Sequence, residues 1–315
     1  MAERRLSLNE LPKVEAVILN WNGIDDTIAC LASIDSAASD QVAVNALVID
    51  NGSSVDPTAH IQATFPRTKI IRVDRNVGFA AGCNLGIKQA IANGVDYILL
   101  LNNDALVRNG LFETLLQSFM ADHSAGIVGP LIYASDEREI DFAGARINFA
   151  AGQFEHVQTE PANAAPYETD YVSGACMMLS RGVIERAGLL DEQLFAYFED
   201  VDLCLRARKI GFRLLCVPVT SAVHKGSSST RRALSEGTTS PLKHYLIARN
   251  RTIIVKRYAP AVAKWFYLIV TLPLRACFYT AAFILRRRWS KLRWFWRGTL
   301  DGIAGNNEMP AELAR

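Results

Sequence analysis

The sequence predicts an α/β fold in which helices cover a mostly parallel sheet. Three observations predict it: strand-like runs alternate with helical stretches, these runs are mostly apolar, and polar clusters follow three of them. The chain has 315 residues, of which half are hydrophobic and 21% are charged, and this excludes a disordered or collagen-like protein. Such a length corresponds to about two domains, or to one large domain with an appendage.

The first half of the chain supplies most of the predicted sheet. Runs rich in β-branched residues predict strands at residues 14–19, 42–49, 69–73, 95–101 and 126–132. Helices are expected between them, at residues 25–34, 79–92 and 111–120. This alternation brings the carboxyl ends of parallel strands to one edge of the sheet, where ligands bind in such folds.

The second half is less regular. Residues 137–170 contain prolines and many small residues, and we expect a hairpin with a loop there. Helices closed by glycine are predicted at residues 181–187 and 199–210, and two short strands at 212–217 and 219–223. The six cysteines form no CxxC pair, so we expect reduced, mostly buried thiols rather than a disulfide scaffold or a zinc ribbon.

The C-terminal region differs in charge from the rest of the chain. Residues 242–300 contain 13 Lys and Arg and no Asp or Glu, which leaves the remainder with a net charge of −11. A basic helix is predicted at residues 242–258, and an apolar stretch follows at 265–285 with Arg275 as its single charge. Basic and aromatic residues come next, at Arg286, Arg287, Arg288, Trp289, Trp294 and Trp296.

Cations interleaved with tryptophans are typical of a segment that docks on an anionic membrane surface. The stretch 265–285 has barely the length of a membrane span and contains Pro273 and a charge, so we expect it to lie on the membrane rather than to cross it. A soluble helical hairpin is the alternative. The apolar content is too high for a phosphate-binding arm, so no nucleic-acid partner is expected. The first residues have no apolar run, which indicates no secretory signal.

Polar clusters follow three predicted strands, at residues 20–23, 50–54 and 102–104. One such cluster is an ordinary turn, but three on the same edge of a sheet indicate a ligand site built from several loops. Asp104 comes after five apolar residues and two asparagines, and its carboxylate could hold Mg²⁺ or Mn²⁺, which prefer oxygen ligands and bridge carboxylates to phosphates. Capping of the following helix is the alternative for this residue.

Three carboxylates, Glu199, Asp200 and Asp202, begin the predicted helix 199–210, whose free N–H groups favour negative charge. Asp200 and Asp202 lie about 200° apart on a helical wheel, so one can face a substrate while the other caps or braces the helix. Simple capping by all three is the alternative. His224 follows an apolar strand and could ligate a metal or contact a phosphate, although a lone histidine is more often structural.

A glycine-containing loop at residues 75–84 opens the helix 79–92, and its backbone can approach an anion closely. It matches neither the G-x-G-x-x-G pattern of dinucleotide-binding proteins nor the GxxxxGK[ST] phosphate loop. The first strand also lacks the dinucleotide pattern, so a nicotinamide-dependent dehydrogenase is disfavoured.

The segments VILNWNG, VIDNGSSVD, RNVGFAAGCN, LLLNND, VSGACMMLSR and FAYFEDVDLCLR, followed by His224, occur in a characteristic order. The series resembles the family 2 inverting glycosyltransferases of the GT-A fold, and within them the bacterial rhamnosyltransferase-like branch that builds cell-surface polysaccharide. The resemblance covers residues 14–260. We therefore expect a GT-A catalytic domain at residues 1–240 and a helical, basic, membrane-associating region at 241–315.

The resemblance implies a nucleotide-diphosphate sugar donor and a divalent cation, Mg²⁺ or Mn²⁺. Asp200 matches the general base, and Glu199 and Asp202 would position it or the acceptor. Asp104 matches the second carboxylate of the metal-binding D-x-D motif, whose first is replaced by Asn102, and His224 resembles a histidine that completes the metal shell in some members. Donor contacts are implied for Asn20, Asn22, Asp50, Asn76, Gly78, Asn84, Asn102 and Asn103.

The implied acceptor is a saccharide or a polyprenyl-linked sugar, reached from the cytoplasmic face of the bacterial inner membrane. The branch suggests dTDP-rhamnose as donor, with UDP-galactofuranose, UDP-glucose and UDP-N-acetylglucosamine as rivals. Two other classes stay open. A nucleotidyltransferase that makes an activated sugar would need a basic glycine-rich loop after the first strand, and residues 21–25 contain no Lys or Arg. The other is a non-catalytic sugar-binding protein of the same fold.

Overall fold

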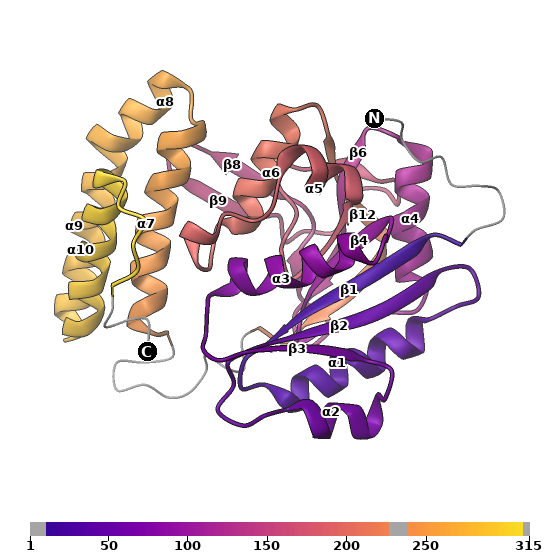
Figure 1. Ribbon diagram of the computed structural model, residues 1–315. Helices are drawn as coiled ribbons and strands as arrows, with labels where there is room; N and C mark the ends of the chain where they lie inside the picture. Colours follow the sequence, from indigo (N-terminus) through magenta and orange to yellow (C-terminus); the bar gives the residue numbers. More distant parts are fainter. Residues whose placement is uncertain (1–10, 227–238, 311–315) are drawn as a thin grey trace.

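A ten-stranded sheet forms the centre of the protein in the computed structural model, which describes residues 11–226 and 239–310 (Figure 1). The strands run in the order β10-β12-β6-β11-β4-β1-β2-β3, with β5 paired to β12 and β7 paired to β6. Helices pack around this sheet, so the predicted α/β fold is confirmed.

One half of the sheet is parallel and agrees with the prediction to within a few residues. β1 (Lys13–Asn20) pairs in parallel with β2 (Ala43–Asn51) and β4 (Tyr97–Asn102), and β2 pairs in parallel with β3 (Lys69–Val73). α1 (Ile24–Ala37) and α2 (Thr58–Thr64) lie on one side of these strands and α3 (Phe79–Ala92) on the other (Figure 1). The short helix α2 was not predicted, because it buries only Ile61 and so has no apolar periodicity.

The other half of the sheet is mixed. β6 (Ala125–Tyr133) and β12 (Arg213–His224) are parallel to each other, but β11 (Cys176–Ser180) runs antiparallel between β4 and β6. The prediction of two short strands at 212–217 and 219–223 is wrong, because β12 is continuous. A register shift between Val217 and Ser221 accommodates Pro218, which cannot donate a hydrogen bond to the ladder. α4 (Leu111–Ala121) packs against β6 and β12.

Short elements connect the two halves. The hairpin expected within residues 137–170 is confirmed as β8 (Ala145–Asn148) and β9 (Gln153–His156). All six cysteines are free and five are buried, as predicted. The remaining short elements are β5 (Ala105–Val107), β7 (Ile140–Phe142), β10 (Tyr167–Glu168), α5 (Arg181–Ala187), the 3₁₀ turn η1 (Glu192–Leu194) and α6 (Glu199–Lys209).

The C-terminal helices form a bundle at one end of the sheet. α7 (Pro241–Tyr258), α9 (Leu272–Leu285) and α10 (Trp289–Ala304) lie side by side at the left of Figure 1. α8 (Ala261–Phe266) and the π-helical turn η3 (Tyr267–Thr271) run into α9, so that residues 261–285 form one continuous helix.

α7 belongs physically to the sheet domain. Its residues Ile253 and Ile254 are buried in the same core as the strands. On its other side α10 approaches closely, because Gly298 has no side chain; a Cβ there would lie 2.2 Å from the carbonyl oxygen of Tyr245. The predicted domain boundary at residue 240 stays a prediction, and α7 is the element that joins the two regions.

A buried Arg–Asn pair on α7 holds the loop that precedes α6. Arg249 and Asn250 both have completely buried side chains. They donate through Nη2 and Nδ2, at 2.8–3.2 Å, to the main-chain carbonyl oxygens of Gln193, Leu194, Ala196 and Tyr197. The first helix of the C-terminal region therefore fixes the backbone directly before Glu199 and Asp200.

This loop needs external support. Phe195, Tyr197 and Phe198 have φ angles of 64°, 68° and 75°, in the left-handed region that residues with a Cβ seldom occupy. Each such residue costs on the order of 1 kcal/mol or more, and it persists only where surrounding contacts determine it. Asn250 alone makes three of those contacts.

Replacing Asn250 with alanine should destabilise the fold by about 2 kcal/mol or more, because the carbonyl groups of Ala196 and Tyr197 lose the donor that Asn250 supplies, while that of Leu194 keeps Arg249. Equilibrium unfolding in urea measures this. Thr252→Val is the matched control on the same helix, since Thr252 is equally buried but bonds Tyr267 instead of the loop. Thr252→Val should lower the free energy of unfolding by about 1 kcal/mol. Equal losses of unfolding free energy for the two variants would contradict the claim that Asn250 supports the loop.

Candidate active site

The carboxyl ends of β1, β2 and β4 meet at one edge of the sheet, as predicted. Asn20, at the end of β1, donates to Asp50 Oδ1 at 2.8 Å and to Ser53 Oγ at 3.2 Å. Asn103, directly after β4, donates to the carbonyl oxygen of Gly23 at 3.1 Å. These hydrogen bonds join three strand ends into one polar rim.

Asp50 lies beneath this rim rather than on it. Its side chain has no exposed surface, and its carboxylate accepts hydrogen bonds from Asn20, Ser53 and Arg72. The Arg72 guanidinium, 2.9 Å away, is 35% exposed. The direct nucleotide contact expected of Asp50 is thus corrected: the structure offers the guanidinium of Arg72 to a ligand, and Asp50 positions it.

Asn22 holds the neighbouring turn. It has a left-handed φ of 55°, and its Oδ1 accepts from both the amide N and the Oγ of Ser54 at 2.9 Å. Its own amide N donates to Ser53 Oγ at 2.8 Å. Asn22 is exposed, so a ligand on the rim can reach it.

Asn51, which was not predicted, organises the loop that opens α3. Its Nδ2 donates to Asn76 Oδ1 at 3.1 Å and to the Gly78 carbonyl at 3.2 Å, while its Oδ1 accepts from Val77 N. Gly78 has a φ of +95°, and a Cβ there would lie 2.6 Å from the ring of Phe195. Only glycine fits at this position, where the loop before α3 touches the loop before α6.

Asn84 faces away from the rim. Its Nδ2 donates to the Leu190 carbonyl and to Glu192 Oε1, both at 2.9 Å, and its Oδ1 accepts from Leu190 N. The side chain is buried. The donor contact implied for Asn84 is therefore corrected to a bracing contact between α3 and the segment before η1.

Asp104 and His224 come together because of strand register. β12 pairs antiparallel with β5 so that His224 lies opposite Ala105. His224 Nε2 is 3.2 Å from Asp104 Oδ1 and 3.2 Å from Asn102 Nδ2, and Nδ1 is 3.9 Å from Asp141 Oδ2. The structure thus places both predicted metal ligands and the asparagine of the variant D-x-D motif in one cluster.

This cluster fits a divalent cation. Burial disfavours the charged imidazole of His224, but its contacts with Asp104 and Asp141 outweigh burial and raise its pKa to about 9, so the surroundings favour positive charge. Asn102 Oδ1 is buried and has no hydrogen-bond partner among the described residues. Among the described residues, no three His, Cys, Asp or Glu side chains form a metal-binding group. A cation held by Asp104 and His224 would therefore have further coordination positions for diphosphate oxygens and water.

Glu199 and Asp200 share one buried site at the start of α6. Asp200 Oδ2 accepts from the amide N of Gly174 at 2.9 Å, and Oδ1 from that of Val201 at 2.7 Å. Burial raises the pKa of Asp200, and these two hydrogen bonds oppose the rise. Burial and the charge of Asp200 raise the pKa of Glu199, whose Oε2 has no partner among the described residues. The two main-chain N–H donors therefore favour the ionised form of Asp200 over that of Glu199.

Asp202 points to the opposite side of α6, as the helical wheel predicted. Its Oδ2 accepts from Arg206 at 2.8 Å, and its Oδ1 from Tyr258 at 2.6 Å and from Arg257 at 3.4 Å. It is buried. Asp202 thus ties α6 to α7 and makes no contact with Asp200, which suits a positioning role and not a contact with an acceptor.

Short links connect the Asp104 cluster with Asp200. Asn102 N donates to the carbonyl oxygen of Ala175 at 3.0 Å, and the neighbouring Gly174 N donates to Asp200. His156, on the β8–β9 hairpin, acts electrostatically on both Asp141 and Asp200. The two predicted chemical centres therefore lie at the same end of the sheet.

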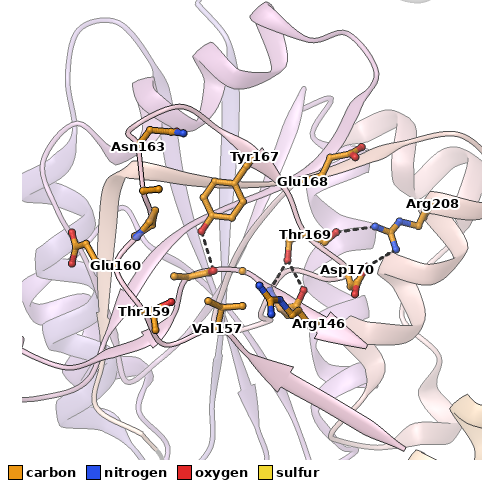
Figure 2. A pocket seen from close by; sticks show the side chains of 15 residues that line it. Arg146, Val157, Thr159, Glu160, Asn163, Tyr167, Glu168, Thr169, Asp170 and Arg208 are labelled. Atoms are coloured by element: carbon orange, nitrogen blue, oxygen red, sulfur yellow. Dashed lines mark hydrogen bonds and ion pairs between the residues drawn. The ribbon is translucent and has the colours of Figure 1, made fainter. Parts of the chain in front are cut away.

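A separate hollow of about 570 Å³ lies beside the segment 157–170 (Figure 2). Figure 2 shows Arg208 reaching Asp170, at 3.0 Å, and the Tyr167 hydroxyl bonded to the main chain. None of the predicted site residues lines this hollow. The strand-end rim, and not the hollow, is the candidate site.

Several residues of the site were missed by sequence analysis. Asn51 and Ser53 belong to the polar cluster at residues 50–54, which the sequence assigned to the ligand site without naming these two residues. Asp141 and His156 stand in the irregular stretch, where no pattern marks them. The others are Arg72, which contacts the rim from β3, and the pair Arg249 and Asn250 on α7.

Curated proteins similar to this chain include two rhamnosyltransferases. The dTDP-rhamnosyl transferase RfbF of Shigella flexneri is 25% identical over 276 residues, which cover 82% of this chain and 86% of that protein. The N-acetylglucosaminyl-diphospho-decaprenol L-rhamnosyltransferase of Mycobacterium tuberculosis is 28% identical over 225 residues, covering 64% of this chain and 72% of the relative.

Solved structures support the same fold. GalNAc-T7 with UDP, GalNAc and Mn²⁺ superposes with a TM-score of 0.65 at 15% identity, covering 96% of this chain and 59% of that one. The mannosyltransferase PcManGT of Pyrobaculum calidifontis, with GDP-Man and Mn²⁺, gives a TM-score of 0.58 at 15% identity, with 95% and 89% covered.

The sequence pattern of the family described as "Glycosyl transferase family 2" matches residues 16–188, more than half of the chain. This span contains β1 to β11, and hence every strand end of the polar rim. With the GT-A fold and the ordered motifs already described, the match shows that this chain is a GT-A glycosyltransferase and belongs to glycosyl transferase family 2.

Proposed function

We propose that the protein transfers a sugar, with inversion, from a nucleotide-diphosphate donor to a hydroxyl group of a lipid-linked saccharide, with Asp200 as the general base. The observation that carries this proposal is the state of the Glu199–Asp200 pair. Asp200 stands at the start of a helix and accepts hydrogen bonds from two main-chain N–H groups, which favour its ionised form, next to a carboxyl group whose pKa is raised. A buried, oriented carboxylate of this kind suits proton abstraction from an alcohol.

The reaction follows from that arrangement. Asp200 accepts the proton of the acceptor hydroxyl while its oxygen attacks the anomeric carbon on the face opposite to the departing diphosphate. One displacement inverts the configuration at that carbon. Helix α6 orients Asp200, because Phe198 O accepts from Asp202 N and the Asp202 carboxylate is bonded to α7.

The donor would lie along the rim, where Asn20, Asn22 and Asn103 order the loops and Asn76 and Gly78 shape the start of α3. Asp104 and His224 would hold Mg²⁺ or Mn²⁺. The ion supplies charge that stabilises the leaving diphosphate. Asn102 offers its buried amide oxygen to the same cluster.

The names of the relatives support a dTDP-rhamnose donor and a diphosphate-linked lipid acceptor. The helix Ala261–Leu285 is, by length and composition alone, apolar enough to cross a membrane, and only 17% of its apolar window is buried. Its strongly exposed apolar residues form an exposed apolar stripe, made of Val262, Trp265, Phe266, Ile269, Leu274, Phe278 and Leu285. Arg286 and Arg287, at the end of this helix, are exposed and could contact anionic headgroups. We therefore propose that the stripe lies on the cytoplasmic face of the bacterial inner membrane.

Asp200→Asn should lower turnover by about 10²–10⁴-fold while donor affinity stays nearly unchanged, because the amide cannot accept the proton. Release of nucleoside diphosphate from a panel of sugar nucleotides, with lipid-linked acceptors, measures turnover. Asp35→Asn, the same change on the exposed face of α1, is the matched control. Near-normal turnover of Asp200→Asn would refute the assignment of the base.

Glu199→Gln should make the protein less sensitive to pH. The pKa of Glu199 is raised in the folded state, so its contribution to stability is fully present below its ordinary value of 4.5 and is lost as the pH rises through the raised value. The stability of Glu199→Gln relative to the wild type should therefore grow above pH 4.5, by up to about 1.4 kcal/mol per pH unit. Urea unfolding from pH 4 to 9 tests this. A difference that is constant with pH would show that folding does not raise the pKa of Glu199.

Asp104→Ala should weaken nucleotide-diphosphate binding in the presence of Mn²⁺ by about tenfold or more and leave metal-free binding unchanged. Isothermal titration calorimetry with and without Mn²⁺ measures the metal-dependent and the metal-free affinity separately. An affinity of the wild type that does not respond to Mn²⁺ would argue against a metal at Asp104 and His224.

A further inference from the structure

Two arginines of the C-terminal bundle have no hydrogen-bond or ion-pair partner among the residues that the structure describes. Arg251 lies on α7 and Arg275 on α9. Nε of Arg251 is buried without a hydrogen-bond acceptor, and across the described ranges 11–226 and 239–310 neither guanidinium forms a hydrogen bond or an ion pair. Residues 242–300 contain no Asp or Glu, so α7, α9 and most of α10 cannot supply one.

The charge of Arg275 also acts on Arg251. Burial lowers the pKa of Arg251 to about 10, and the positive charge of Arg275 contributes to this decrease. Buried donors in native proteins are nearly always satisfied, and an isolated buried cation is costly. The buried, unsatisfied Nε of Arg251, close to a second cation that has no partner in the described ranges, therefore indicates that an anion belongs beside these guanidinium groups.

Aromatic rings surround the pair. Arg251 lies over the ring of Phe198 at 5.9 Å, and Arg275 over that of Tyr279 at 5.7 Å. Both arginines also act electrostatically on Tyr267. Phe198 is the residue directly before α6, two positions from Asp200. The cations thus stand next to the loop that carries the proposed base.

Their position also relates them to the exposed apolar stripe. Arg275 belongs to the helix whose outer residues, such as Leu274 and Phe278, are exposed. A ligand bound between the arginines could therefore extend an apolar chain along that helix and a polar head toward Asp200.

We infer that Arg251 and Arg275 form a phosphate subsite, which binds the diphosphate of the lipid-linked acceptor. This inference rests on the proposed function. Two guanidinium forks match a diphosphate in charge and in donor geometry. The donor diphosphate is not the favoured occupant, because the cation-binding residues Asp104 and His224 lie on β5 and β12 and not on the bundle.

The test uses the full chain, without donor, and three probes. These are neutral phosphatidylcholine vesicles that contain farnesyl diphosphate, vesicles of the same surface charge that contain phosphatidylglycerol, and inorganic pyrophosphate in solution. Co-sedimentation measures vesicle affinity. The wild type should bind farnesyl diphosphate vesicles more tightly than phosphatidylglycerol vesicles, and pyrophosphate should compete for the former.

Arg251→Gln and Arg275→Gln should each lower affinity for the farnesyl diphosphate vesicles by about tenfold, the worth of a charge-assisted hydrogen bond. Their affinity for phosphatidylglycerol vesicles should not change. Arg293→Gln, which removes an exposed charge from α10, is the matched control and should lower binding to both vesicles slightly and equally.

Three results would overturn the inference. Equal losses on both vesicles would mean a general contact with phospholipid headgroups, and no loss would mean that no phosphate binds. A fall of several degrees in the thermal midpoint of Arg251→Gln would mean a structural role, since removing an unpaired buried charge should leave that midpoint unchanged or raise it. None of these measurements involves turnover, so they fail or succeed independently of the base assignment tested with Asp200→Asn.

Discussion

The left-handed loop before α6 is the constraint on which the rest of the site depends. Its three positive φ angles turn the chain so that α6 begins with Asp200 directed toward Gly174 and Asp202 directed toward α7. Such a backbone does not hold itself in place, and the carbonyl groups it exposes are bound by Arg249 and Asn250. The same loop presents Phe195 to Gly78, so it also shapes the loop before α3.

Two neighbouring carboxyl groups acquire different properties in this setting. Both are buried, but Asp200 accepts from the amides of Gly174 and Val201, whereas Oε2 of Glu199 has no partner among the described residues. Because two adjacent buried carboxylates repel each other, these contacts favour the charge on Asp200 and the proton on Glu199. On the opposite face of α6, Asp202 is bonded to arginine and tyrosine, which leaves Asp200 on a rigid support.

Local patterns predicted most of the fold. β3, α3 and α5 begin and end where apolar runs and glycine signals place them, and the three polar strand ends do meet. The insertion of β11 between β4 and β6, and the burial of Asp50 under Arg72, depend on segments far apart in the chain. Motif position alone therefore identified Asp104, Asp200 and His224 as candidates but could not tell that Asp50 and Asn84 are enclosed.

The role of α7 was hidden for the same reason. Its arginines look in sequence like part of a basic, membrane-docking tail, yet Arg249 is one of the most deeply buried residues of the protein and bonds the loop before α6. A continuous path of contacts thus runs from the exposed stripe of the helix 261–285, through α7, to the backbone before Asp200. If the stripe rests on a membrane, this path holds the base at a set height above the bilayer. An acceptor confined to that bilayer then meets the base at a high effective concentration, which a freely diffusing enzyme of the same chemistry would lack.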